Sequence, residues 1–272
     1  MKQIKSYGCV LMLAALATLA AAPEARAQVP GAVTLKGSGT RRFVGSLRWQ
    51  ATSKSIQVTD AKNISTTHPL TEIASIQAVR PRELDQAIRA VKDKNGAVAI
   101  AALTKIATDY FMLQHDEEAT LWLAEAYLQT GNSAEAVRAV EKITSTRPEA
   151  AYLGEMATVY WRALLRENRA AKLDDLLEQA IKSGNRMASA SALILRGDLI
   201  LKGGDTQDHH TRALKDGYLR VVTLYRSVRT VQPEANYKAA KSLEKLGMTS
   251  RAQARREVIR KEFPGSEWAN KP

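Results

Sequence analysis

The chain has almost no cysteine. Cys9 is the only one in 272 residues, and it stands just before an apolar run at residues 10–22. A lipid anchor would need its cysteine after such a run, so Cys9 does not predict one. If the segment that holds Cys9 is removed, the remaining chain has no thiol, which excludes disulfides, thiolate catalysis and cysteine-ligated metals. Stability must then come from buried apolar surface, for which about 245 residues are ample.

Membrane-spanning runs are also missing. The apolar run after Cys9 is shorter than the roughly 20 residues that cross a bilayer, and no later stretch predicts a membrane helix. Lys2 and Lys5 precede the run, and the small residues Ala25 and Ala27 end it in the pattern that signal peptidase accepts. We therefore expect a signal peptide at residues 1–27, cleavage after Ala27, export to the periplasm or outside the cell, and a mature chain without a transmembrane segment.

The sequence lacks the patterns of catalytic and cofactor sites. Lys36-Gly37-Ser38-Gly39 has neither the spacing nor the Lys-Ser/Thr end of a phosphate-binding loop. No His-Glu-x-x-His pair occurs, and among the four histidines only His209 and His210 are adjacent. Adjacent residues on a helix point about 100° apart, so both rarely reach one metal ion. We expect no catalytic residue, no cofactor and no metal site, and a protein that is not an enzyme.

One tripeptide, Arg196-Gly197-Asp198, spells an adhesion signal. Such a signal needs an exposed, extended loop, whereas this one interrupts residues 192–201, an apolar segment of helical pattern. We interpret Gly197 as a glycine at which helices pack closely.

Positive charge is in excess. The formal net charge is +12, and the predicted signal holds three basic residues and one acidic residue, so the mature chain keeps 12 − (3 − 1) = +10. A basic exported protein meets anionic envelope polymers, lipid head groups or acidic proteins. A run near the end predicts a basic stripe on the last helix, without the interleaved aromatic residues that stack on nucleic-acid bases, so no nucleic-acid partner is expected. The run consists of Arg251, Arg255, Arg256, Arg260 and Lys261.

Residues 28–80 are rich in β-branched residues and short alternations, which predict a small β module. Strands are expected at residues 33–35, 43–49 and 55–58. The apolar residues spaced through residues 70–79 fit either another strand or a helix. The order of these segments resembles that of SH3-like and Sm-like small barrels, which implies a barrel of four or five short strands.

Residues 81–272 follow a different pattern. Alanine, leucine and charged residues dominate, and apolar residues recur at intervals of three and four, as in amphipathic helices. Short breaks separate the helical segments, and each contains a glycine, which predicts helical hairpins joined by tight turns. These breaks fall at residues 95–96, 131–132, 184–185, 203–204 and 247.

Two windows of the helical part are alike. Sliding residues 117–150 onto 233–266 superposes a loop glycine, a packing alanine and a terminating proline. The superposed pairs are Gly131 on Gly247, Ala136 on Ala252, Pro148 on Pro264, Ala119 on Ala235 and Ala124 on Ala240.

The first window resembles a tetratricopeptide repeat, a 34-residue helix-turn-helix unit. Leu123 and Ala124 match its Leu-Gly pair, Tyr127 its aromatic residue, Ala136 its second-helix alanine and Pro148 its closing proline. The resemblance implies a mainly α-helical solenoid of about five hairpins, preceded by the SH3-like module and the signal peptide. It also implies a surface that binds proteins or peptides. The chain looks like exported helical repeat proteins that assist outer-membrane assembly in bacterial envelopes.

In this family the concave groove is lined by fixed positions of each repeat, which nominates a partner-binding set here. Trp161 in this set is equally well interpreted as a core residue. We expect a non-enzymatic exported scaffold that binds a protein or peptide partner in the groove. The alternative is a cell-envelope adaptor that binds peptidoglycan or another anionic polymer through its basic faces. The nominated residues are Leu121, Glu125, Leu128, Trp161, Arg162, Asp198, Lys202, Tyr237 and Lys241.

Overall fold

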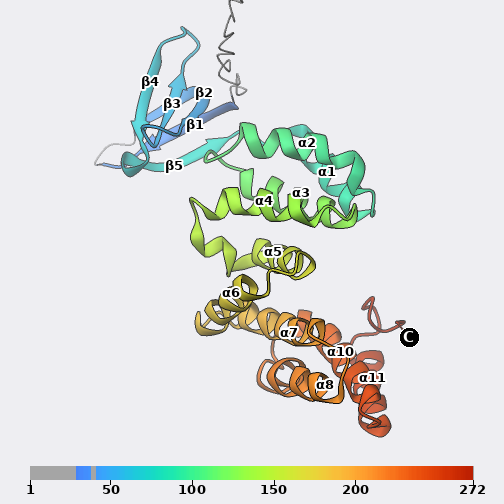
Figure 1. Cartoon of the computed structure of the whole chain (residues 1–272). Helices are drawn as coiled ribbons and strands as arrows, with labels where there is room; N and C mark the ends of the chain where they lie inside the picture. Colours follow the sequence, from blue (N-terminus) through green and yellow to red (C-terminus); the bar gives the residue numbers. More distant parts are fainter. Residues whose placement is uncertain (1–28, 38–40, 272) are drawn as a thin grey trace, which may run out of the picture.

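The computed structural model describes residues 29–37 and 41–271, so the predicted signal peptide and its cleavage site lie outside the described residues. Figure 1 shows a small antiparallel sheet followed by a stack of helices. A 3-10 helix, η1 (Leu70–Glu72), precedes the last strand. The strands are β1 (Val29–Leu35), β2 (Arg42–Gln50), β3 (Ser55–Thr59), β4 (Ser65–Pro69) and β5 (Ile73–Ala78).

The three strands that the sequence predicted are present as β1, β2 and β3, and neighbours pair in the order β4-β3-β2-β1-β5. The structure makes β5 a strand, which the sequence left open between strand and helix. Its pairing with β1 shifts so that Thr34 faces Ser75 and Leu35 faces Ile73, which leaves one extra residue, Ala74. This bulge lets Ile73 and Ile76 point to the same face although they are three positions apart. The likeness to SH3-like barrels stays a prediction.

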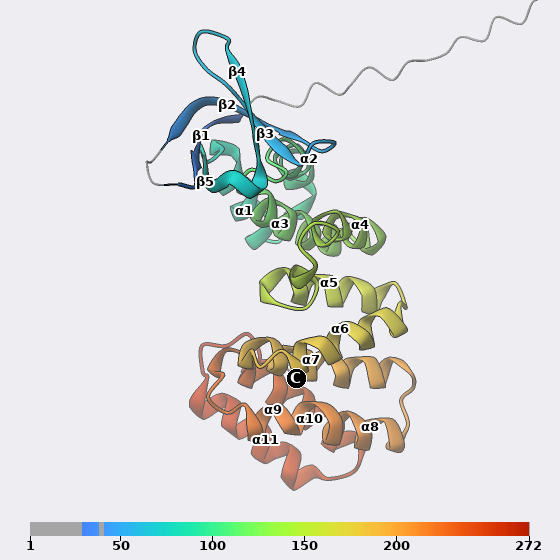
Figure 2. The same cartoon turned by 90° about the vertical axis from the view of Figure 1, so that its left-hand side faces the viewer.

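The helices follow one another in pairs, and each predicted glycine-containing break lies between two of them. Figures 1 and 2 both place the sheet at one end of the stack and the last pair at the other. Among the described residues, no helix is long and apolar enough to span a bilayer. The helices are α1 (Arg82–Lys92), α2 (Gly96–Asp109), α3 (Asp116–Gln129), α4 (Ser133–Thr144), α5 (Gly154–Arg166), α6 (Ala170–Lys182), α7 (Arg186–Lys202), α8 (Gln207–Ala213), α9 (Leu219–Leu224), α10 (Gln232–Lys245) and α11 (Thr249–Glu262).

The internal repeat is visible in the structure. α3 and α10 are both 14 residues long, and they begin 116 positions apart, which is the offset between the two windows. The alanines that superpose are all buried: Ala124, Ala136 and Ala240 expose 0% of their surface and Ala252 exposes 1%. Residues 117–150 therefore form a two-helix unit that continues into its neighbours, as the sequence predicted.

The fourth pair is irregular. A π-helical turn, η3 (Leu214–Tyr218), joins α8 to α9 and brings Gly217 against Gly197 of α7. A Cβ atom at Gly197 would lie 2.4 Å from Cε1 of Tyr218. The Tyr218 hydroxyl donates a hydrogen bond of 2.8 Å to Oδ1 of Asp198, which fixes the ring. The tripeptide at residues 196–198 is thus a helix-packing element, as expected.

The sheet is attached to the first two hairpins by specific bonds. The Tyr110 hydroxyl donates to the carbonyl of Val79 at 2.9 Å, and the Gln114 side chain accepts from the backbone of Ala78 at 2.8 Å. Arg80 bonds Glu118 of α3 through both terminal nitrogens, at 2.6 and 2.9 Å. This hydrogen bonding holds the pKa of the Glu118 carboxyl below its usual value. The β module therefore packs on the helical part, a point that the sequence left undecided.

We predict that Gly197→Ala lowers the free energy of unfolding by about 1–3 kcal/mol, because the added methyl group overpacks a buried, hydrogen-bonded ring. Urea denaturation followed by circular dichroism measures the change. Gly265→Ala is the matched control, since no atom lies within 4 Å of a Cβ built there. Equal stability of the two variants would show that Tyr218 moves freely.

Candidate functional site

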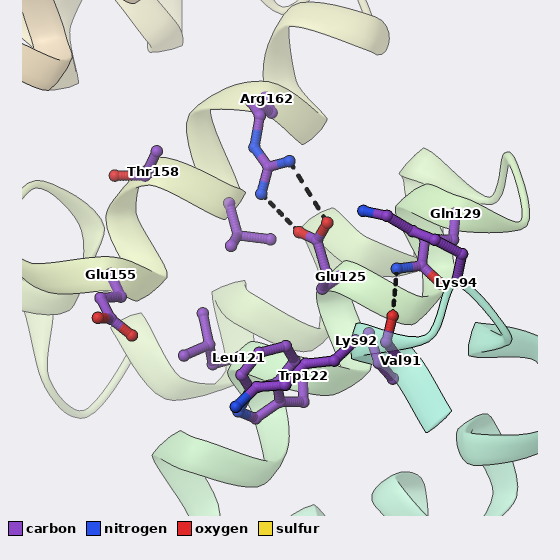
Figure 3. A pocket seen from close by; sticks show the side chains of 11 residues that line it. Val91, Lys92, Lys94, Leu121, Trp122, Glu125, Gln129, Glu155, Thr158 and Arg162 are labelled. Carbon is purple, nitrogen blue, oxygen red and sulfur yellow. Dashed lines mark hydrogen bonds and ion pairs between the residues drawn. The ribbon is translucent and has the colours of Figure 1, made fainter. Parts of the chain in front are cut away.

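A pocket of about 470 Å³ lies between α1, α3 and α5, which belong to three successive hairpins (Figure 3). Its apolar lining comes from the buried Val91 and Val159 and from the half-buried Leu121 and Trp122. Polar and charged side chains complete it: Lys92, Lys94, Glu125, Gln129, Glu155, Thr158 and Arg162.

Two polar links across the pocket hold the three hairpins in place. Arg162 of α5 pairs with Glu125 of α3, with a distance of 2.5 Å from Nη2 to Oε2. Gln129 of α3 donates to the carbonyl of Val91 at 2.8 Å and accepts from the backbone of Gly96 at 3.0 Å. Figure 3 shows the bonds of Glu125 and Gln129 beside Trp122. The pocket is therefore built on side chains whose positions are fixed by bonds between hairpins.

A second hollow of about 560 Å³ lies beside the first, at the N-terminal ends of α3 and α5. Leu121 and Glu155 line both hollows, so together they form one continuous groove. We call this surface the α3 groove. Its second part is lined also by His115, Glu117, Glu118, Glu149, Ala150, Leu153, Gly154 and Met156.

Three of the nominated partner-binding residues meet in the α3 groove. Leu121, Glu125 and Arg162 come from two hairpins, and all line its first pocket. Trp161 and Leu128 do not belong to it, because they expose only 1% and 4% of their surface.

The structure places Trp161 in the core, and this corrects its interpretation as a groove anchor. The indole nitrogen of Trp161 donates to the carbonyl of Ala151 at 2.9 Å, inside the protein. Leu128 is likewise a core residue, and the groove uses its neighbour Gln129 instead.

The remaining nominated residues lie elsewhere. Asp198, Tyr237 and Lys241 line a separate hollow of about 520 Å³ between α7 and α10, and Lys202 lines neither site. The Asp198 carboxylate is already bonded there, to Tyr218 and, at 2.5 Å, to the Nζ atom of Lys238. Six of the nine nominated residues therefore divide between two sites, two are core residues and Lys202 lines neither site, so they do not form one continuous surface.

In the same region the ring of Tyr237 is met by Trp268 from the segment after α11, with centroids 5.1 Å apart. The nominated face of α10 is thus partly covered by the chain itself.

Sequence reasoning missed Trp122, Lys92 and Lys94. Trp122 directly follows the nominated Leu121, and its half-buried ring lies 5.2 Å from the Nζ atom of Lys92. Lys94 has a left-handed backbone, with φ of 62°, just after α1. The sequence signal that could have found the two lysines is the charged Lys-Asp-Lys-Asn-Gly segment at residues 92–96. It spans the turn after α1, beside α3, and from there its two lysine side chains reach the groove.

The two adjacent histidines are bonded to nearby groups. His210 is buried, with Nε2 2.6 Å from Oδ1 of Asp205 and Nδ1 3.2 Å from the Ser242 hydroxyl. His209 bonds Thr206 at 2.7 Å through Nδ1. Within the described residues no group of three or more potential ligands is placed to hold a metal ion.

We predict that Trp161→Ala lowers the free energy of unfolding by about 3–5 kcal/mol, as large-to-small changes in a core do. Trp122→Ala, which removes the same atoms from a half-buried site, should cost less. Urea titrations of both variants give the two values. A smaller loss for Trp161→Ala than for Trp122→Ala would contradict the assignment of Trp161 to the core.

Comparison with known proteins supports the helical repeat. Residues 234–266 match the family model of a tetratricopeptide repeat, and this range covers α10 and α11 almost entirely. The match thus falls on the second of the two windows and not on residues 117–150, where the sequence pattern was clearest. No curated protein and no solved structure matches the chain. Tetratricopeptide repeats generally mediate contacts between proteins, so the matched hairpin points to a protein partner.

Proposed function

We propose that the chain is an exported, non-enzymatic scaffold whose α3 groove binds an extended segment of a protein partner. The observation that carries the proposal is the meeting of Leu121, Glu125 and Arg162 with Trp122 in one pocket. The first three were nominated from repeat positions alone, and hairpins that stack in register bring such positions together. A half-buried tryptophan beside bonded polar groups is the kind of anchor on which protein interfaces depend.

Binding at this groove needs little rearrangement of the scaffold. The Arg162–Glu125 and Gln129 bonds already fix the groove walls, so a partner loses mainly its own conformational freedom. The match of residues 234–266 to a repeat that is typically a non-catalytic scaffold fits the same view.

The alternative function is an adaptor that grips peptidoglycan or another anionic polymer. At 100° per residue the predicted basic run does not form one stripe, because Arg256 points about 140° from Arg251. Arg256 is also paired with Glu244 at 2.8 Å. A hollow lined by Arg226, Arg229 and Arg255 fits this alternative better, since Glu262 is the only carboxylate that lines it.

Export is part of the proposal and rests on residues 1–27. We predict that the chain produced in a bacterial host is shortened to begin at Gln28, because Ala25 and Ala27 fit the small pockets of signal peptidase. Mass spectrometry of the purified protein measures its N-terminus. Ala27→Phe should leave the precursor uncut, whereas Gln28→Ala should not. An N-terminus still at Met1 in the unaltered chain would contradict export by this route.

For the groove, we predict that a photoreactive benzoylphenylalanine at Thr158 forms a discrete crosslink to one partner in cells that make the full chain. The same group at Arg138 should not, because that exposed residue lies on α4 and lines none of the hollows described above. Trp122→Ala should weaken the Thr158 crosslink by about tenfold or more, as loss of a central aromatic anchor does. Crosslinks of equal strength from both positions would contradict the groove. Binding that falls steeply with salt and depends on Arg226 and Arg255 would favour the polymer.

A further inference from the structure

The α3 groove has unpaired charges of opposite sign at its two ends. At the end of α1, Lys92 and Lys94 line the groove, and neither has a carboxylate within salt-bridge distance in the described chain. Lys92 contacts the Trp122 ring instead. Asp93, between them in the chain, does not line the groove. This end therefore offers two cations beside an aromatic surface.

The other end offers two carboxylates. Glu149 lines only the second hollow, whereas Glu155 lines both hollows and so lies where the two parts of the groove join. Both are exposed, and neither pairs with a cation in the part of the chain that the structure describes.

The other acidic residues at this end are already paired. Glu117 bonds Arg147 at 3.0 Å and Glu118 bonds Arg80 at 2.6 Å. His115, which also lines the hollow, lies 3.5 Å from the Arg80 guanidinium through its Nδ1 atom. The unpaired acidic charge is thus confined to Glu149 and Glu155.

Between the two ends the groove carries no unpaired charge among the described residues. Leu121 and Val159 line it, and the one charged pair there, Arg162 with Glu125, is closed at 2.5 Å. Lys92 and Lys94 line only the first pocket, Glu149 lines only the second hollow, and Glu155 lies at their junction, so positive charge faces a ligand toward one end and negative charge toward the other.

Helix dipoles explain only part of this arrangement. Lys92 lies in the last turn of α1 and Glu155 in the first turn of α5, where the dipole favours their charges. Lys94 and Glu149 lie outside these α-helices, yet each extends the charge of its end into the groove.

We propose that the partner segment carries acidic residues at one end, an apolar residue in the middle and basic residues at the other. This inference rests on the proposed function and names the chemistry of its partner. The acidic end lies on Lys92 and Lys94, the apolar residue on Trp122 and Leu121, and the basic end on Glu149 and Glu155. The 14 residues of α3 rise about 20 Å, which an extended segment of about six residues covers.

Labelled synthetic peptides test the charge order on the full chain by fluorescence polarisation. One six-residue peptide carries two aspartates, two central leucines and two lysines in that order. A second has the reverse order, because the partner segment could run along the groove in either direction. A third has the same composition with alternating charges. The better of the ordered peptides should bind about tenfold more tightly than the alternating one at low salt, from several exposed charge pairs acting together.

Lys92→Glu combined with Lys94→Glu should abolish that preference and favour a peptide with lysines at both ends. Lys62→Glu combined with Lys215→Glu makes the same change in net charge away from the groove, and it should leave the preference intact. If the Lys92/Lys94 variant keeps the original preference, or no peptide binds, the charge order is wrong. A different outcome separates the two proposals. If the three peptides bind equally well and Trp122→Ala weakens all of them alike, the proposed order of charges is wrong while binding in the groove stands.

Discussion

Close approach of neighbouring helices at alanine is the constraint on which the helical stack depends. In the two similar hairpins α3 packs against α4 and α10 against α11, and the four alanines that superpose in them, Ala124, Ala136, Ala240 and Ala252, are all buried. A larger side chain there would push the helices apart and open cavities on both sides of the contact. Because the described chain contains no cysteine, no disulfide supports this packing. α10 begins 116 positions after α3, the same offset that separates the two similar sequence windows.

That packing also decides which side chains face the groove. In α3 the row Leu121, Glu125 and Gln129 is spaced by four residues, so it stays on one side of the helix. Leu128 lies off this row and is directed into the core, as Trp161 is at the corresponding place in α5. α3 and α5 therefore each bury one nominated residue, while the next residue along each helix, Gln129 or Arg162, lines the groove. Two residues of this half-buried row, Glu125 and Gln129, are bonded to neighbouring hairpins, and these bonds fix its shape.

Much of this could be predicted from the sequence, and the failures have physical causes. The helix breaks are marked locally by glycine and three of the strands by β-branched residues, so the sequence predicted these elements correctly. β4 reads Ser-Thr-Thr-His-Pro, and its pairing to β3 is decided by the sheet and not by its own composition. In β5 the bulge at Ala74 replaces the period of two with a spacing of three, which imitates a helix. Trp161 could not be assigned because both interpretations place an aromatic ring beside a helix crossing.

The unpaired charges of the α3 groove are compatible with a stable fold. An exposed salt bridge contributes little to stability, about 0–1 kcal/mol, so folding alone does not require Lys94 or Glu149 to find a partner within the chain. The groove pairs Glu125 with Arg162, where the side chains are partly buried and an unpaired charge would be costly. The charges toward the ends of the groove are exposed and stay solvated, so leaving them unpaired costs the fold little. An oppositely charged segment that pairs with these solvated groups would gain electrostatic selectivity, while the scaffold needs no such pair in order to fold.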